Sequence, residues 1–552
     1  MLNQLASNHL YTCSYRVIIE SLEHLHIMHE IQSSNLLASW KAEVLPEAVR
    51  AGATAEPHAT TCHVYISASG PFPHATVSIL LYAVGRLYLY ISIYHHSLLG
   101  IFPHTESYMS RNLAPACNHA ALCLESSAYA AEAEFERPTE AQRLAAAKPK
   151  KQSKQAQPDP CEDDPKTFPA PLMLPGDNLA EDSDCPPQSF QQWLGGKHRN
   201  AVTRRRRVVY VVTAPQIDDD VAFMKSWAKP QGLSQKAQTQ SPCPGDIRGY
   251  MAAFYHGLPV EALPVSPSFV PWEKKKTSKG SFPQYIGFGV KRDCTRIRVR
   301  PSPDGIYGGQ LNLDDFLDAA IRILPSDAYA LILLVDHDLY EDEEDEFVCG
   351  RAYGGSRVAV VSSARYNPDL DEYQDIQRLH AWPASHCQEY VSMCCDEFLP
   401  KPKVQKKSKS TKASKAIKPN AVPSGPMEAA LAAYRNLPFS TLSPSARTAL
   451  WLGRICRTGS HELGHCFGIA HCSYYACSMQ GTASICEDAR QPPYLCPVDL
   501  AKVLHATSST ESERYHALLS FCERPGMKST HFFAPFAAWI QARLYESAGQ
   551  SA

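Results

Sequence analysis

The segment HELGHCFGIAH, from His461 to His471, constrains the fold of this chain more than any other part of its sequence. On an α-helix, residues four positions apart share one face, so His461 and His465 can present ring nitrogens to one metal ion. Glu462 follows the first histidine, where its carboxylate can lean over a water molecule on that metal. The pattern therefore predicts a helix that carries two metal ligands and a base.

The end of the segment completes the ligand set. Gly468 permits the backbone to turn out of the helix, so that His471 can return as the third ligand. Three protein ligands with an open fourth position are typical of catalytic zinc, because structural zinc is closed by four ligands. The alternative is a surface helix with three unrelated histidines. Three residue types at fixed positions rarely coincide by chance, which favours the catalytic zinc site.

Length, charge and cysteine usage limit the class of protein. A chain of 552 residues suits two or three domains, and a net charge of −2 predicts no strong attraction to nucleic acid or anionic membrane. The 19 cysteines are odd in number and scattered, unlike a secreted disulfide framework. The first 20 residues lack a basic region followed by an apolar core and a cleavage site. We expect the cytosol or nucleus, where clustered cysteines are candidates for metal binding.

The segment from Val77 to Tyr94 approaches transmembrane length. Arg86 lies at its centre, where a charge costs about 2.5–3.5 kcal/mol on insertion scales. The same spacing suits an aromatic-rich pair of strands. We therefore expect no membrane span.

Composition divides the chain into five regions. Residues 1–130 form an N-terminal region of uncertain fold, and residues 131–166 are too hydrophilic to build a core and predict a disordered linker. Residues 167–400 predict a subdomain of sheet and helices, and residues 427–545 a second subdomain with the active-site helix. Between them, residues 401–426 are rich in lysine. This insertion could be a nucleic-acid or nuclear-targeting patch, but it has no aromatic residues to stack on bases, so we favour a disordered loop.

Hydrophobic patterns predict alternating strands and helices after residue 167. The last predicted helix carries the histidines, begins at a cap formed by Ser443 or Ser445, and has Leu450, Ile455 and Leu463 as candidates for its buried face. Strands interleaved with helices predict an α/β layer with a mixed sheet. The other expected elements are strands at 208–212, 296–300, 330–335 and 357–365, a helix from Asp246 closing at Gly257 and Pro259, and a helix at 311–324 capped by Asn312.

A cysteine cluster follows the third histidine. Cys472 and Cys477 form a C-x4-C pair, and Cys496 and Asp499 form a later C-x2-D pair. Three thiolates and one carboxylate could close a tetrahedral zinc. Cys486 and His505 are alternatives to Asp499 as the fourth ligand, and the simplest alternative is a group of small buried residues without a metal.

These motifs resemble those of the metzincin zinc metalloproteases. His461, Glu462, His465, Gly468 and His471 match the extended zinc motif, and Met479 matches by position the methionine turn that forms a hydrophobic floor beneath the zinc. The cysteines Cys472, Cys477 and Cys496 narrow the resemblance to the archaemetzincins, whose pattern binds a second zinc and ends in C-x-x-C. Asp499 replaces the final cysteine of that pattern, and the harder carboxylate puts the strength of the second site in doubt.

The resemblance extends from about Phe168 to Ile540 and does not cover the first 165 residues. It implies a metzincin-like zincin fold, of the α/β (α+β) class, in which a mixed twisted sheet packs on helices and a C-terminal subdomain follows the active-site helix. It also implies an edge strand that would pair with substrate. We place that strand in Phe347–Gly355, where the glycines would let a peptide approach closely.

The expected function is a zinc-dependent peptidase acting on peptide or protein substrates. Zinc on the three histidines would polarise the scissile carbonyl and activate a water, with Glu462 as general base. Residue 481 is Gly, so no tyrosine two positions after Met479 is assigned a role. An alternative is a zinc-stabilised interaction module with weak catalysis, against which the intact Glu462 argues. Nucleic-acid binding through Lys401–Lys418 is a third hypothesis, which the near-neutral charge disfavours.

Overall fold

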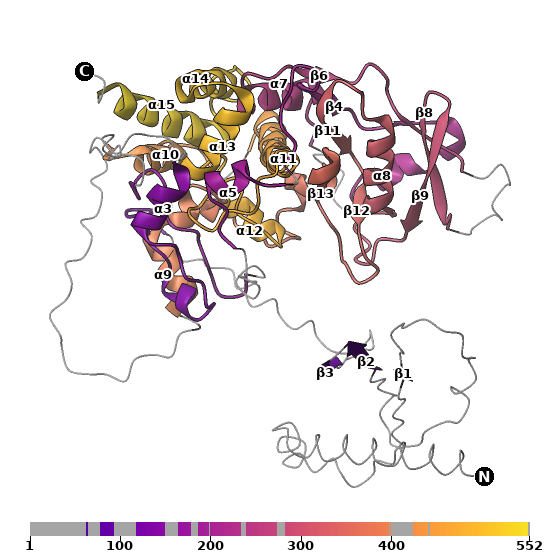
Figure 1. Cartoon of the computed structure of the whole chain (residues 1–552), viewed down its shortest axis with the longest axis horizontal. Helices are drawn as coiled ribbons and strands as arrows, with labels where there is room; N and C mark the ends of the chain where they lie inside the picture. Colours follow the sequence, from indigo (N-terminus) through magenta and orange to yellow (C-terminus); the bar gives the residue numbers. More distant parts are fainter. Residues whose placement is uncertain are drawn as a thin grey trace, which may run out of the picture. The chain divides into compact units, whose positions relative to one another are not determined.

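The computed structural model describes residues 62–63, 78–84, 86–92, 117–148, 164–177, 186–197, 199–232, 239–272, 282–396, 398, 423–439 and 442–549. The chain divides into two compact units, Met1–Met109 and Ser110–Ala552. Figure 1 draws the whole chain and labels its elements. The Lys-rich insertion predicted at 401–426 falls almost wholly outside the described residues, so its structure is not considered further.

The first unit contains an antiparallel three-stranded sheet. Its strands are β1 (Cys62–His63), β2 (Ser78–Val84) and β3 (Arg86–Ser92), in that order. The hairpin formed by β2 and β3 covers the segment that we considered as a membrane span. The alternative of a strand pair is therefore confirmed. Among the described residues, every helix is too short or too polar to cross a membrane.

A five-stranded sheet lies at the centre of the second unit. The strand order is β13 (Gly350–Tyr353), β14 (Val358–Ser362), β11 (Ala328–Val335), β4 (Val208–Val212) and β6 (Val260–Ala262). The last four strands are parallel, and β13 pairs antiparallel with β14 at one edge. All eight residues of β11 are buried. The predicted mixed sheet and its apolar strands are confirmed, because strands covered on both faces read as continuous apolar runs.

The two faces of this sheet belong to two different cores, as the period of two along a strand requires. On β11, Leu331, Leu333 and Val335 pack in one core, with the helix α8 (Leu313–Ile323) and a second sheet. Ile332 and Leu334 pack in the other core, with the long helix α11 (Pro444–Cys466) and the C-terminal helices. The sheet is thus the middle layer of three.

The second sheet has six strands and packs in the same core as α8. The predicted strand at 296–300 is part of its strand β9. Asn312 caps α8 by accepting a hydrogen bond from the Asp315 amide, as predicted. The strand order is β12 (Asp338–Tyr340), β10 (Gln310–Asn312), β9 (Asp293–Arg300), β8 (Tyr285–Val290), β7 (Ser268–Val270) and β5 (Gln216–Ile217).

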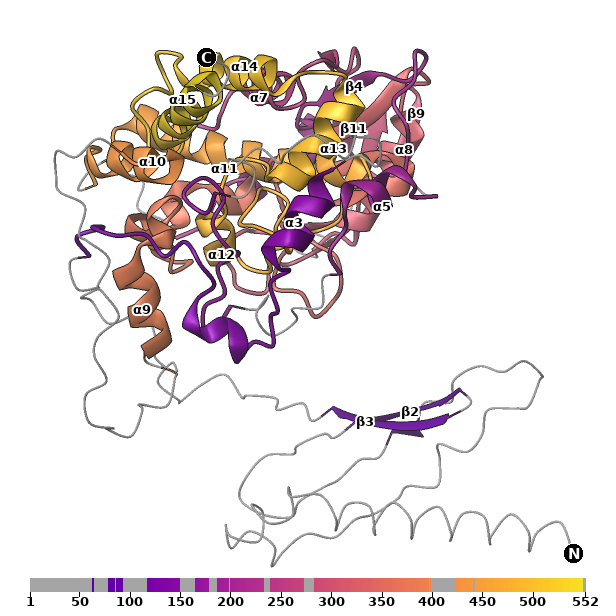
Figure 2. The same ribbon diagram turned by 60° about the vertical axis from the view of Figure 1, so that its left-hand side comes forward.

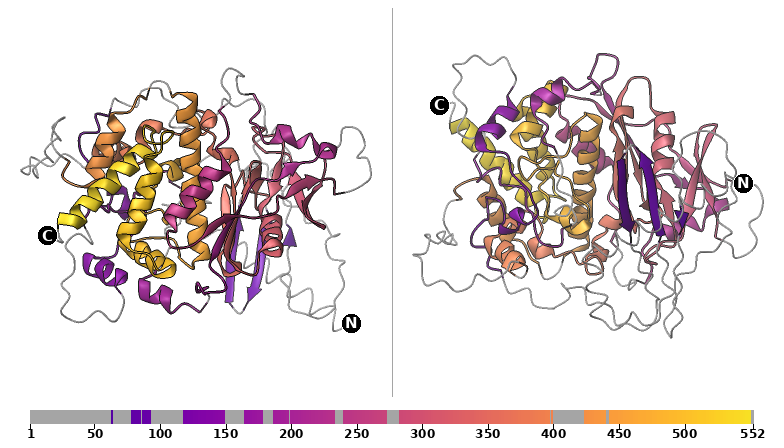
Figure 3. Two further views of the ribbon diagram at one scale, coloured as in Figure 1. Left: turned by 90° about the horizontal axis from the view of Figure 1, so that it is seen from above. Right: turned by 60° about the horizontal axis from the view of Figure 1, so that its bottom comes forward.

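Helices cover the opposite face of the central sheet. Figures 1 and 2 show α10, α14 and α15 on one side of this unit and β9 on the other, with α11 between them. Both views of Figure 3 show the same separation of orange and yellow helices from the strands. The remaining α-helices of the described part are α3 (Glu140–Ala147), α5 (Phe190–Leu194), α6 (Met224–Trp227), α7 (Pro244–Phe254), α9 (Gln388–Asp396), α10 (Pro426–Arg435), α12 (Ile485–Arg490), α13 (Pro497–Thr507), α14 (Glu511–Cys522) and α15 (Phe533–Gly549).

Helix α11 begins as the sequence predicts. The Ser443 side chain accepts from the Ala446 amide, an N-cap that contributes about 1 kcal/mol to helix stability. Leu450, Ile455 and Leu463 are all buried. The helix packs against β13, β14 and α7, so its histidines emerge beside the edge of the central sheet.

The predicted linker at 131–166 differs from the structure over part of its length. Helix α3 lies within it and has a capping box between Thr139 and Gln142. Arg137 and Arg143 both place their guanidinium groups over the ring of Tyr475. Charged composition misled the prediction because long arginine stems can cover an apolar surface that lies far away in sequence. Residues 149–163 of the predicted linker lie outside the described residues.

Candidate metal centres and active site

His461 and His465 occupy the last turns of α11, with their ring orientations fixed by backbone carbonyls. The Nδ1 atom of His461 lies 2.8 Å from the Ser478 oxygen, and that of His465 lies 2.8 Å from the Ile469 oxygen. A carbonyl can only accept, so each Nδ1 carries the proton and each Nε2 presents a lone pair. Hydrogen bonds from Nδ1 to a backbone carbonyl are typical of histidines that bind metals through Nε2, because they hold the ring in place.

The third histidine returns to this site after the chain leaves the helix. Gly468 adopts a φ of +78°, the left-handed conformation that glycine tolerates and that ends α11. One ligand atom from each of His461, His465 and His471 lies within 4.8 Å of the others. The structure therefore brings together the three predicted histidines.

The histidine cluster fits a cation. The Nε2 atoms of His461 and His465 are 3.0 Å apart, although both are acceptors when their Nδ1 atoms donate to carbonyls. Two lone pairs at this distance repel each other, and a metal ion between them would turn the repulsion into two bonds. Burial lowers the pKa of His465 to about 4, which keeps its imidazole neutral and suited to ligation.

Glu462 lies in the same helical turn and lines the same cavity. Burial raises the pKa of its carboxyl to about 8, while Arg351 opposes this rise and Asp488 adds to it. A cation held by the histidines would lower this pKa and favour the ionised carboxylate. The position and the burial of Glu462 suit a general base whose pKa lies near neutral pH.

Met479 is fully buried against the histidine helix. An added Cβ at Gly464 would lie 2.4 Å from the Met479 sulfur, so a larger residue there would displace the Met479 side chain. The Cys472 amide donates to the Met479 carbonyl at 2.7 Å, which closes the turn. Met479 thus packs directly beneath the residues between His461 and His465.

A cavity of about 550 Å³ opens beside Glu462 and the histidines. One wall is the segment Phe347–Ala352, which includes β13, and β13 is an edge strand, as predicted. Other lining residues come from α11, from the loop after it and from the segment 482–491, which contains α12; they are Thr458, His461, Glu462, His465, His471, Thr482, Ala483, Ser484, Ile485, Asp488 and Gln491, together with Tyr366. The histidine cluster and Glu462 therefore border one accessible space.

The glycines of this edge have a different role from the one predicted. An added Cβ at Gly350 would lie 2.9 Å from the Val360 oxygen, and one at Gly354 would lie 2.4 Å from the His465 oxygen. They allow the edge strand to pack against β14 and α11. At Gly350 and Gly354 the Cβ positions face the protein itself, so these two glycines serve packing, whereas an added Cβ at Gly355 would meet no atom within 4 Å.

Sequence reasoning missed Arg351 in this wall. Its guanidinium lines the cavity, pairs with Glu341, and is close enough to Glu462 to oppose the rise in its pKa. The same cavity ends at Asp488, which accepts a hydrogen bond from buried Arg457 at 2.8 Å. The alternation of residues along β13 could have indicated which side chains face the site, but only after the strand's edge position was known.

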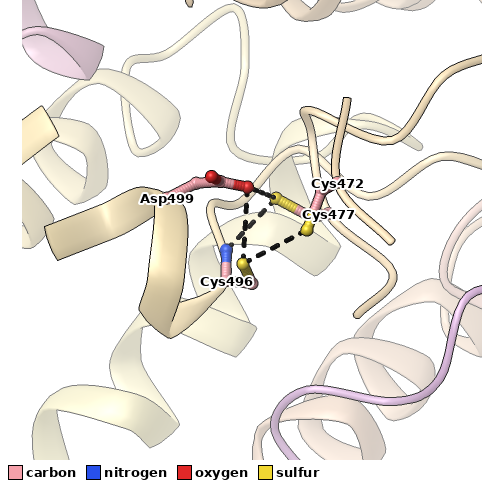
Figure 4. A group of neighbouring side chains, drawn as sticks. All are labelled: Cys472, Cys477, Cys496 and Asp499. Carbon is pink, nitrogen blue, oxygen red and sulfur yellow. Dashed lines mark hydrogen bonds between the residues drawn. The ribbon is translucent and has the colours of Figure 1, made fainter. Parts of the chain in front are cut away.

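The predicted cysteine cluster is also assembled. Figure 4 shows the side chains of Cys472, Cys477, Cys496 and Asp499 pointing toward one another. One ligand atom from each lies within 4.8 Å of the others, and all four residues are buried. The sulfurs of Cys472 and Cys496 are 3.5 Å apart, close to the separation of about 3.8 Å that two thiolates adopt around tetrahedral zinc.

The backbone around the cluster favours thiolates. The Cys477 sulfur accepts from the amides of Met479 and Cys496, at 3.4 and 3.3 Å. Burial raises the pKa of both Cys477 and Cys496 well above the usual range. A metal ion would overcome that rise, because a coordinated thiol loses its proton. These donors fit zinc.

Asp499 has a second buried partner that sequence reasoning missed. Lys502 donates to its Oδ1 at 2.8 Å, while its Oδ2 lies 3.4 Å from the Cys477 sulfur. The spacing of three along α13 could have suggested this pair. The two alternative ligands lie elsewhere, since Cys486 donates to the Gln374 carbonyl and the His505 ring packs on Phe190 and Trp193.

This chain is similar in sequence to known proteins. Residues 436–504 match the model of "Peptidase family M54". Archaemetzincin-2 from Pongo abelii is 24% identical over 358 residues, which are 64% of this chain and 74% of that protein. Archaemetzincin-2 from Homo sapiens is 23% identical over 355 residues, with the same shares of 64% and 74%.

A solved structure also matches, but more weakly. The match to the crystal structure of archaemetzincin from Methanopyrus kandleri covers 97% of that chain and 55% of this one, at 16% identity and a TM-score of 0.25. A superposition of this quality carries no argument. The relationship rests on the sequence matches and on the motif residues.

Proposed function

Because this chain belongs to the archaemetzincins, the zinc metalloproteases of peptidase family M54, we propose that its histidine cluster binds the catalytic zinc and that Glu462 is the general base. His461, His465 and His471 would be the ligands. The observation that carries the proposal is the 3.0 Å approach of two Nε2 acceptors beside a cavity that Glu462 also lines. The fourth position of the metal is left for water or substrate.

The chemistry requires little from the protein beyond ligation and proton transfer. When bound, zinc acts as a Lewis acid that polarises a carbonyl and makes a water molecule acidic near neutral pH. Glu462 would accept the proton from that water and pass it to the leaving amine. Its burial supports this role, because a base that is isolated from solvent returns its proton to the substrate.

Substrates are peptides or proteins, and we propose that they bind along β13. This strand is the free edge of the central sheet, so a peptide can add to it by main-chain hydrogen bonds. Arg351 lies on the same strand and lines the cavity. Its positive charge would favour substrates that have an acidic group close to the scissile bond. Such a group would compete with Glu341 for the Arg351 guanidinium.

A second ion would be structural. Cys472, Cys477, Cys496 and Asp499 offer four ligands and are closed from solvent, as a structural zinc requires. Reduced thiols are needed at this site, which supports a cytosolic or nuclear location.

The alternative of an interaction module without catalysis is not favoured. A scaffold needs no carboxylate beside its metal and no cavity at an open coordination position. Here Glu462 and the cavity of about 550 Å³ occur together at the histidines. The combination supports catalysis.

The decisive experiment replaces Glu462 by glutamine, which keeps its size and removes its basicity. We expect Glu462→Gln to lower the cleavage of a diverse peptide mixture about 10²- to 10⁴-fold while zinc content stays at the wild-type value. Glu343→Gln, the same change at an exposed position, should leave both quantities unchanged. Full activity of zinc-loaded Glu462→Gln would falsify the assignment of the base.

A further inference from the structure

A third group of metal-binding side chains lies apart from the two sites above. One ligand atom from each of Cys117, His119 and His380 lies within 4.8 Å of the others. Cys117 and His119 come from the first described residues of the second unit, and His380 ends the 3-10 helix Arg378–His380. Segments more than 250 residues apart therefore bring three good zinc ligands to one point.

Both histidines have an unused ring nitrogen. Among the residues that the structure describes, the Nε2 atoms of His119 and His380 have no hydrogen-bond partner. The two residues are only 6% and 2% exposed. An unpaired buried polar atom costs about 1–3 kcal/mol, so two of them at one place point to a missing ligand. The Nδ1 atom of His380 lies 3.1 Å from the Gln377 side-chain oxygen, which directs its Nε2 lone pair outward from that bond.

A fourth donor is adjacent. The sulfur of Cys387 lies 3.0 Å from the sulfur of Cys117. Tetrahedral zinc, with bonds of about 2.3 Å to sulfur, places two thiolates about 3.8 Å apart. The two sulfurs would therefore have to separate by less than one ångström to bind one ion, and the sulfur of Cys387, which lies outside the group of three, would have to move closer to the histidines. Two cysteines and two histidines form a common ligand set of structural zinc.

The surrounding backbone holds the two segments in register. Leu122 forms an antiparallel bridge with Cys387, and the Cys123 amide donates to the His386 carbonyl at 2.7 Å. The ring of Tyr390 stacks on His380 at a centroid distance of 4.0 Å. These contacts fix the ligands before any ion binds, which lowers the entropic cost of binding.

We propose that Cys117, His119 and His380, completed by Cys387, form a structural zinc site that anchors the segment around residues 117–123 to the body of the peptidase. The site uses residues that the catalytic mechanism does not need. Its role is to fasten the chain where the second unit begins. The proposal stands or fails independently of the catalytic zinc.

The test compares zinc bound to the full-length protein with ligands intact or removed. We expect Cys117→Ser and His380→Gln each to bind about one zinc ion fewer per chain than the wild type, measured by elemental analysis after gel filtration. Cys123→Ser is the matched control, because Cys123 is a buried neighbour outside the group, and it should keep the wild-type value. Equal zinc content in Cys117→Ser, His380→Gln and the wild type would overturn the proposal.

A second measurement uses the unmodified chain, in case a variant fails to fold. Reduced, zinc-loaded protein is treated with N-ethylmaleimide before and after chelation, and each cysteine is followed by peptide mass spectrometry. Cys117 should be protected at least about 10-fold by zinc, because a coordinated thiolate is a poor nucleophile. Exposed Cys243 should react equally in both samples. Equal labelling of Cys117 before and after chelation would show that no metal is bound there.

Discussion

The histidine cluster and the cysteine cluster lie within one short stretch of chain, yet their surroundings are opposite. The histidines offer three ligands beside a cavity of about 550 Å³. The cysteines and Asp499 offer four ligands, and Cys477, Cys496 and Asp499 are at most 1% exposed. A metal with an open coordination position can bind water or substrate, whereas a metal with four protein ligands only joins segments of the chain. The number of ligands and the access of solvent would together separate a reactive zinc from a structural one.

The largest expected effect is on activity at the open site. We expect His465→Ala to lower peptide cleavage by at least about 10³-fold, because loss of a ligand removes the Lewis acid. The free energy of unfolding should change less than when the closed site is broken. Cleavage assays and thermal denaturation of the same preparation measure both quantities.

The control for this variant is His505→Ala, at an exposed histidine of α13. It should cleave peptides at the wild-type rate. If His465→Ala kept its activity, the open site would not be catalytic and the contrast between the clusters would disappear.

The next effect concerns stability at the closed site. Cys477→Ala should lower the free energy of unfolding by about 3 kcal/mol or more, because a structural zinc contributes directly to folding. Urea denaturation with zinc in excess is the measurement. Cys486→Ala removes a half-buried cysteine that lies outside the cluster, and we expect a loss of about 1 kcal/mol at most. Equal losses in the two variants would show that the cluster holds no structural metal.

The smallest effect concerns the charge of the closed site. Three thiolates and a carboxylate around a zinc ion carry a net charge of about −2, and Lys502 is the buried cation that bonds to Asp499. Lys502→Met should therefore weaken zinc binding about 10-fold, as loss of an outer-shell partner does. Competition with a chromophoric chelator measures the affinity.

Lys502→Arg keeps the positive charge and serves as the matched variant. It should retain most of the zinc affinity. An affinity in Lys502→Met equal to that of the wild type would mean that Asp499 does not take part in binding, and that the cluster uses only its thiolates.

Prediction from sequence succeeded where the information is local. The helix at 444–466, its cap at Ser443 and the histidines at fixed spacing depend on neighbours within a few turns. The apolar runs of β4, β11 and β14 identified buried strands for the same reason. Patterns of this kind survive folding because tertiary contacts reinforce them.

Prediction failed where partners are distant. Helix α3 was assigned to a linker because the segment around it is rich in charge, proline and glutamine. Its burial is explained only by distant partners, which are Tyr475, α5 and α13. The glycines at the sheet edge were assigned to substrate, but Gly350 packs closely on β14 and Gly354 on the carbonyl of His465. A local sequence pattern does not show which distant atoms a residue will contact.

The sequence by itself determined the candidate ligands, the candidate base and the methionine that follows them, because one helix and the turn after it place these residues within reach of one another. Tertiary structure decided which cluster is open to a cavity, that Lys502 balances Asp499, and that Cys117 meets His380. The physical reason is that solvent access and charge compensation depend on every segment packed around a site, and those segments are far apart along the chain.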